Sequence, residues 1–236
     1  ILGVGGNVGQ GIIKALRNSN LKAQIHGACI SPYSAGLYMC DKQIISPYAT
    51  DGLFIEWLVT YCRKYNINVV LSGVEEVLKE LSCYKIFLEK ETNAKIIVSN
   101  KETFDICLDK YQTIKWLEDN GLNHPKTYKL SEINTFDECV KKLGTISISK
   151  PIHGKGSIGV SKINNENDFL KLKEKKSSEM ILQEYLGNDA SEYTSAVYCD
   201  RAGKIRGSII FKRTLFSGTT YKAEIVENKK GENYIT

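Results

Sequence analysis

The fold of this chain is decided around residues 147–160, SISKPIHGKGSIGV. Successive side chains of a strand point to opposite faces, so the strand that opens this stretch places Ile146, Ile148 and Lys150 on one face. An ammonium group beside aliphatic side chains is costly unless an anion meets it. Pro151 ends the strand, and the glycines that follow let backbone N–H groups approach an anion. The stretch predicts an anion-binding strand and loop, with a surface hairpin of solvated lysines as the alternative; the GxxxxGK[ST] order of a P-loop is absent.

Size and composition indicate a globular protein. The 236 residues suffice for two or three compact units, and 42% hydrophobic and 25% charged residues are ordinary values. No apolar run approaches the roughly 18 residues of a membrane helix, and we expect no signal peptide. The net charge of +5 comes with scattered lysines, which favours a polyanionic small molecule over a nucleic acid. We therefore expect a cytoplasmic protein with neither a membrane nor a nucleic-acid partner.

Cysteine and histidine spacing gives no metal site. The seven cysteines are odd in number and form no CxxC pair, which favours reduced thiols over a disulfide framework or a zinc site. The histidines His26, His124 and His153 lie far apart in the sequence. We expect each of them in a loop or on the surface.

The N-terminal residues 1–11, ILGVGGNVGQG, predict a strand, a glycine turn and a helix, the opening of a βαβ unit. Gly9 would permit close packing of the helix on the strand. The dinucleotide fingerprint fails, because Gly3 and Gly5 require a third glycine where Val8 stands, and no acidic residue ends the next expected strand. A Rossmann-like domain without a dinucleotide is therefore preferred to one that binds NAD.

Strands and helices alternate through the first half, which predicts a parallel sheet covered by helices. Glu75 and Glu76 follow a buried-type strand at the sheet edge where ligands bind in such folds, but a solvated first helical turn is the preferred interpretation. The expected strands are 24–30, 43–47, 68–73 and 94–100, and the expected helices are 51–66, 78–89 and one from Lys101.

The second half predicts antiparallel strands with helices. Asp109 is placed to cap a helix that Gly121 stops, and Thr135 with Glu138 has capping-box spacing. Later strands are expected at 180–186, 191–200 and 204–216, the last two joined by the turn Arg201-Ala202-Gly203, and a charged helix is expected at 165–176. The change in pattern near residue 110 predicts an α/β domain over 1–108 and an α+β domain over 109–236.

Five features follow one another in the second half: Asp109-Lys110, Lys150-Pro151, the glycine loop, Gln183-Glu184-Tyr185 and Glu192-Tyr193. In this order they resemble the ATP-grasp superfamily, most closely its carbamoyl phosphate synthase large-subunit-like members. The segment GVGGNVGQGIIKAL is similar to the pre-ATP-grasp domain, a Rossmann-like fold that binds no dinucleotide. The resemblance covers nearly the whole chain and implies a pre-ATP-grasp domain followed by an ATP-grasp domain whose C-terminal part is missing.

The resemblance also implies roles for particular residues. Lys110 and Lys150 would contact the α- and β-phosphates of ATP, and Arg213, or less suitably Lys212, would face the γ-phosphate or the substrate carboxylate. Glu192 would accept the ribose hydroxyls. The loop that closes over the phosphates would contain Gly154, Lys155, Gly156, Ser157 and Gly159, and the adenine would be bound by Gln183, Glu184, Tyr185 and Leu186.

The implied reaction is ATP-dependent ligation, in which ATP phosphorylates a carboxylate or bicarbonate and an amine attacks the acyl phosphate. Its cofactors would be ATP and Mg, and its partners would be small-molecule carboxylates and amines. The protein could form a homodimer. The magnesium-binding carboxylates are expected beyond Thr236, so the chain as given is expected not to turn over. A non-catalytic nucleotide-binding module and an NAD-linked oxidoreductase stay as alternatives.

Overall fold

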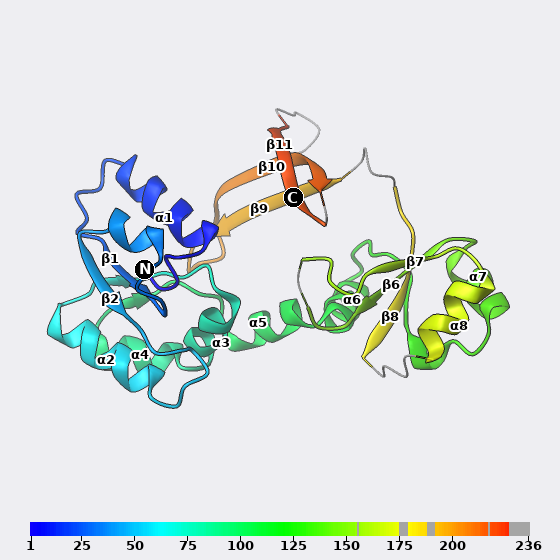
Figure 1. Cartoon of the computed structure of the whole chain (residues 1–236), viewed down its shortest axis with the longest axis horizontal. Coiled ribbons are helices and arrows are strands. Elements are labelled where there is room, and N and C mark those ends of the chain that lie inside the picture. Colours follow the sequence, from blue (N-terminus) through cyan, green and yellow to red (C-terminus); the bar gives the residue numbers. More distant parts are fainter. Residues whose placement is uncertain (155, 175–178, 188–191, 217, 227–236) are drawn as a thin grey trace. The chain divides into compact units, whose positions relative to one another are not determined.

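The computed structural model describes the chain except for residues 155, 175–178, 188–191, 217 and 227–236. The chain divides into two compact units, Ile1–Asp105 and Ile106–Thr236 (Figure 1). We propose 108/109 as the domain boundary, which is the end of helix α5 (Lys101–Leu108). The part of the chain that is described contains no helix with the length and apolar character needed to cross a bilayer.

The first unit is built on parallel strands, as the alternating pattern predicts. Leu2 bridges in parallel to both Ala28 and Ser72, so the N-terminal segment lies between two pairs of strands. Each pair, β1 with β2 and β3 with β4, is also parallel. The strands are β1 (His26–Cys29), β2 (Lys42–Ile45), β3 (Val69–Val70) and β4 (Lys95–Ile96).

Helices follow these strands at the expected places, with one difference. The single helix expected at 78–89 is two helices, because the backbone of Tyr84 (φ −104°, ψ 13°) lies outside the helical region. Glu75 and Glu76 form the exposed first turn of the earlier helix, as the preferred interpretation predicts. The helical segments before α5 are α1 (Asn7–Arg17), the 3-10 turn η1 (Ala35–Met39), α2 (Phe54–Lys64), α3 (Glu75–Cys83) and α4 (Lys85–Thr92).

Gly9 brings α1 against the N-terminal segment, as the sequence predicts, but this segment forms isolated bridges at Leu2 in place of the expected strand. A Cβ atom on Gly9 would lie 2.6 Å from the carbonyl oxygen of Gly3 and 2.8 Å from the Cα of Val4. These are backbone atoms, so the contact can be relieved only by moving the helix away from the sheet.

Two alanine substitutions in this helix are expected to have opposite effects. Gly9→Ala should lower the free energy of unfolding of the first unit by about 1–3 kcal/mol through overpacking. Gly11→Ala, in the same helix with no atom within 4 Å of its added methyl group, should raise it by about 0.5–1 kcal/mol because alanine has the higher helix propensity. Urea unfolding followed by circular dichroism measures both, and equal effects would contradict the close contact.

The second unit begins with a four-stranded antiparallel sheet in the order β5-β8-β6-β7. Its strands are β5 (Thr127–Lys129), β6 (Ser147–Pro151), β7 (Ser161–Ile163) and β8 (Met180–Glu184). Two helices, α7 (Phe136–Leu143) and α8 (Glu166–Glu174), cover one face, where Leu182 and Ile163 are buried with Phe169 in the core. The helix α6 (Lys110–Asp119) and the 3-10 turn η2 (Leu130–Glu132) complete this part.

The aliphatic face of β6, which carries Ile148 and Lys150, is not the face that is buried in the core. The covered face carries Ser147 and Ser149, which are 1% and 0% exposed, whereas Ile148 on the other face is half-buried. Small side chains allow α7 to pack closely here, and the Ser149 hydroxyl is paired with that of Ser161 at 2.9 Å. Lys150 therefore lies on the face of the sheet that α7 and α8 do not cover.

Both predicted helix caps of the second unit are present. The Asp109 carboxylate accepts hydrogen bonds from two backbone N–H groups in the first turn of α6, and the Thr135 hydroxyl accepts one from Glu138 N–H at 3.2 Å. The Glu138 carboxylate accepts from the N–H of Asn134 rather than from that of Thr135, so only half of the expected capping box forms.

The unit ends with a three-stranded antiparallel sheet in the order β11-β10-β9. Gly203, with a φ of +76°, forms the turn between β9 (Tyr193–Cys199) and β10 (Ile205–Phe216), as the sequence predicts. The strand β11 (Thr219–Ile225) was not among the expected elements; it continues the antiparallel sheet with its Lys222 paired to Thr214.

Candidate functional site

Polar side chains gather on the face of the four-stranded sheet that α7 and α8 do not cover. Thr127, Gln183, Ile148 and Lys162 form one row across the four strands, because their Cα atoms are paired in register. Lys150 lies on the same face two residues beyond Ile148. We call this surface the polar face and define it by Thr127, Lys150, Lys162, Gln183 and Tyr185.

Lys150 is held on the polar face by a neutral partner. Its Nζ donates to Oε1 of Gln183 at 2.5 Å, and Nε2 of Gln183 donates to the hydroxyl of Thr127 at 2.7 Å. Burial lowers the pKa of the Lys150 ammonium, and the nearby charge of Lys110 lowers it further. Gln183 and Thr127 are both neutral. The structure therefore places a partly desolvated cation here, and these two partners do not balance its charge.

Lys110 adds a second cation close to the first. It begins α6 directly after the Asp109 cap, and its Nζ donates to the carbonyl oxygens of Gly154 at 2.9 Å and Ile152 at 3.4 Å. Within the described ranges, neither Lys110 nor Lys150 forms an ion pair. Two adjacent ammonium groups bonded to neutral oxygens form a site suited to an anion with several oxygens.

The glycine loop lies beside Lys110. Gly154, Gly156 and Gly159 all have positive φ values (134°, 65° and 76°), which glycine adopts without strain. Ser157 shares this conformation with a φ of 58°, and its hydroxyl donates to the carbonyl oxygen of Gly218 at 3.2 Å. Lys155, the remaining residue expected in this loop, lies outside the described residues.

The Gln183-Glu184-Tyr185 segment continues the polar face at the end of β8. The Glu184 carboxylate accepts from the backbone N–H of Lys126 at 2.7 Å, so it fixes the approach to β5. Tyr185 is half-buried and its hydroxyl accepts from Nζ of Lys162 at 3.0 Å, whereas Leu186 is exposed. Sequence reasoning missed Lys162, although strand alternation in residues 160–163 would have placed it on the face opposite to Ile163.

The remaining candidate residues lie on the three-stranded sheet. Glu192 and Arg213 form an ion pair, and Nη1 of Arg213 also donates to the hydroxyl of Thr220 at 3.2 Å. The Arg213 Nε atom is buried and has no hydrogen-bond partner among the residues that the structure describes. Lys212 is exposed while Arg213 is half-buried, as expected for neighbours on a strand.

A magnesium site is not formed by the residues at hand. Across the described ranges, no three histidine, cysteine, aspartate or glutamate side chains cluster in a way that could hold a metal ion. The carboxylates that would hold Mg are expected beyond Thr236. The seven cysteines are all free thiols.

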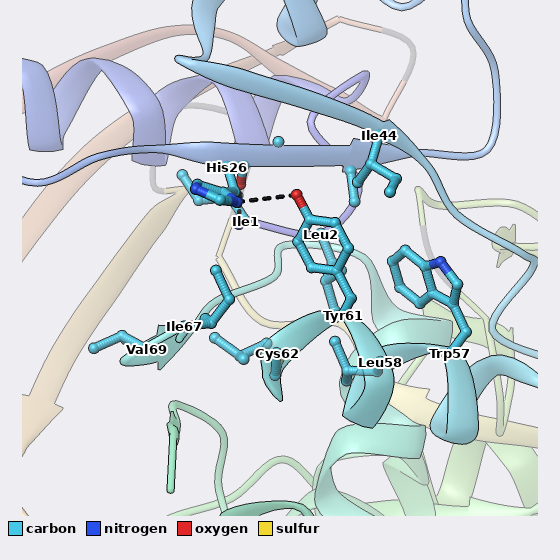
Figure 2. Close-up of a pocket in the computed structure, with 13 residues that line it drawn as sticks. Ile1, Leu2, His26, Ile44, Trp57, Leu58, Tyr61, Cys62, Ile67 and Val69 are labelled. Atoms are coloured by element: carbon cyan, nitrogen blue, oxygen red, sulfur yellow. Dashed lines mark hydrogen bonds between the residues drawn. The ribbon is translucent and has the colours of Figure 1, made fainter. Parts of the chain in front are cut away.

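His26 corrects one expectation, because it is buried in β1 rather than placed in a loop or on the surface. Figure 2 shows its ring beside Tyr61, whose hydroxyl lies 2.9 Å from Nδ1. Both residues line a cavity of about 30 Å³ in the first unit, which has room for a water molecule but not for a nucleotide. His153 is exposed, as expected, and His124 is half-buried.

The buried ring makes the stability of the first unit depend on pH. Burial and the charge of Lys42 lower the pKa of His26 below its ordinary value of 6.5, so the unfolded chain takes up a proton on this ring more readily than the folded protein does. Stability is complete above about pH 6.5 and is lost as the pH falls below it. Urea unfolding of the wild type and of His26→Gln is measured between about pH 8 and pH 5.5. The free energy of unfolding should decrease less for the variant than for the wild type as the pH falls. His153→Gln, which changes an exposed ring, should keep the wild-type pH dependence.

Comparison with known families identifies the domains. Residues 1–98 match the model of a PylC-like, N-terminal domain, and residues 107–202 match that of an ATP-grasp domain. A search of curated proteins gives no match.

Solved structures share the fold at low sequence identity. N5-carboxyaminoimidazole synthetase from Staphylococcus aureus, complexed with ADP, has a TM-score of 0.76 and 17% identity over 99% of this chain and 60% of that chain. The biotin carboxylase domain of Hydrogenobacter thermophilus 2-oxoglutarate carboxylase has a TM-score of 0.71 and 13% identity, covering 99% and 55%. An L-amino acid ligase from Bacillus licheniformis has a TM-score of 0.62 and 14% identity over 90% of this chain and 51% of that chain. This chain spans about 60% of the length of the first of these proteins.

Proposed function

We propose that this chain, in which an ATP-grasp domain follows a PylC-like N-terminal domain, belongs to an ATP-dependent ligase. The ligase phosphorylates a carboxylate or bicarbonate and passes the acyl phosphate to an amine. More specifically, we propose that the phosphorylated substrate is bicarbonate, as in carbamoyl phosphate synthase. The protein is cytoplasmic and acts on small molecules, and it needs Mg for turnover.

One observation carries the proposal: two neighbouring ammonium groups, those of Lys110 and Lys150, bond only to neutral oxygens in the described part of the chain. Phosphate oxygens would supply the missing negative charge to both ammonium groups and accept their hydrogen bonds. The glycine loop beside them offers backbone N–H groups to the same anion.

The other residues take roles around this phosphate site. The loop from Gly154 to Gly159, with Lys155, covers the phosphates and excludes water from the reactive acyl phosphate. Gln183 and Glu184 with the backbone of Tyr185 and Leu186 bind the adenine, and Glu192 accepts the ribose hydroxyls.

Arg213 stabilises the charge that develops on the transferring phosphoryl group, and Lys212 is the weaker candidate. Because Glu192 and Arg213 are paired with one another, nucleotide binding has to replace this ion pair by contacts to hydroxyl and phosphate oxygens.

A ligand panel tests the proposal. Calorimetric titration and thermal unfolding are measured with MgADP, MgATP and NAD, followed by phosphate release from MgATP in pools of carboxylates and amines, with a protein extended beyond Thr236 so that the expected magnesium-binding carboxylates are included. Binding of adenine nucleotides with substrate-dependent phosphate release supports a ligase. Binding without phosphate release in any pool favours a nucleotide-binding module, and a response to NAD alone favours an oxidoreductase.

A further inference from the structure

Lys162 contacts Tyr185 in a way that none of the roles above requires. Its Nζ donates to the Tyr185 hydroxyl at 3.0 Å and lies 4.4 Å from the centroid of the same ring. The two residues come from different strands, β7 and the end of β8, and are 23 positions apart. The contact therefore holds the ring against the polar face.

The position of this ring matches the shape of a nucleotide. The Lys150 ammonium reaches Oε1 of Gln183, and Tyr185 lies on the same face two residues further along the same chain segment. At roughly 3.3 Å per residue, Tyr185 is about 7 Å along the chain from the residue that the phosphate-binding cation contacts. A base bound beside this ring would therefore lie next to a phosphate bound at Lys150, as the two parts of one nucleotide do.

An aromatic ring at that distance offers a surface to a base. Every nucleobase has a π-face, and stacking on an aromatic side chain contributes about 1–3 kcal/mol. A ring free to change rotamer would lose part of this contribution when it became ordered on binding. A lysine that already fixes the ring removes that loss.

We propose that Lys162 is a positioning residue that fixes the Tyr185 ring as a wall of the base subsite and thereby strengthens the binding of adenine nucleotides. This inference rests on the proposed nucleotide-binding function. Lys162 acts through Tyr185 and contacts neither the phosphates nor the base itself.

A double-mutant cycle tests the inference. Lys162→Met keeps the aliphatic stem and removes the donor, and Tyr185→Phe keeps the ring and removes the acceptor. Each should raise the Kd for MgADP about fivefold, and the double variant should raise it no further, because both changes remove the same contact. Lys162→Arg, which can still donate, should restore most of the affinity.

Other outcomes overturn the inference. An unchanged Kd in Lys162→Met would show that the contact does not matter for binding, and additive effects in the double variant would show that Lys162 acts on the nucleotide directly. Titration with pyrophosphate separates the phosphate part of the ligand from the base. If Lys162 only positions Tyr185, the affinity for pyrophosphate is unchanged in Lys162→Met. An equal loss of affinity for pyrophosphate and for ADP would overturn the inference. If wild-type protein binds pyrophosphate or ADP but Lys162→Met does not differ from it, only this inference fails; if the wild type binds neither, the proposed function fails with it.

Discussion

Replacing Lys150 by methionine is expected to abolish the thermal stabilisation of the protein by MgADP. The substitution removes a charged donor to phosphate whose hydrogen bonds contribute about 3 kcal/mol together, which is a loss of roughly 100-fold in affinity. Without nucleotide, the melting temperature should stay close to that of the wild type. The lost hydrogen bond to Gln183 is offset by relief of a desolvated ammonium group near Lys110.

Thermal unfolding with and without MgADP measures this effect. The matched control is Lys171→Met, which removes the same charge from an exposed position of α8, the helix on the covered side of the sheet. The control should keep the full stabilisation by nucleotide. A normal response of Lys150→Met to MgADP would remove the central support for the phosphate site.

The second large effect is expected in the core under the polar face. Phe169 is 1% exposed and lies against Phe136, with 6.3 Å between the ring centroids. Phe169→Ala should lower the free energy of unfolding of the second unit by about 3–5 kcal/mol, because it leaves a cavity between α7, α8 and the sheet. Leu170→Ala is the control, since the next residue of the same helix is 52% exposed and its truncation should cost less than about 1 kcal/mol.

The two tryptophans of the chain allow the units to be followed separately. Trp57 belongs to α2 in the first unit and Trp116 to α6 in the second. In a Trp57→Phe background, fluorescence reports on the second unit alone, and the effect of Phe169→Ala should be seen there. In a Trp116→Phe background the unfolding of the first unit should stay unchanged, and equal shifts of both would contradict the division into two units.

The sequence was informative wherever a local rule acts on neighbouring residues. The Asp109 cap, the parallel strands of the first unit, the approach of α1 at Gly9 and the turn at Gly203 were all predicted, because each depends on residues close in sequence or on a simple period. The order of the five motifs likewise led to the ATP-grasp domain that the family comparison identifies at residues 107–202. The individual site residues stay predictions that the experiments above can test.

Long-range packing decided what the sequence could not. His26 looked like a loop residue but is buried beside Tyr61, because its partner lies 35 positions away. The burial of Ser147 and Ser149 in place of Ile148, the isoleucine of the same strand, depends on how closely α7 packs.

The sequence by itself determined the class of the fold and the position of a cationic strand followed by a glycine loop. Only the tertiary structure decided that Lys110 approaches Lys150, that Glu184 is engaged by Lys126, and that Lys162 holds Tyr185. The physical reason is that each of these contacts joins segments between 23 and 58 positions apart, and their meeting depends on strand order and register, which no local pattern specifies.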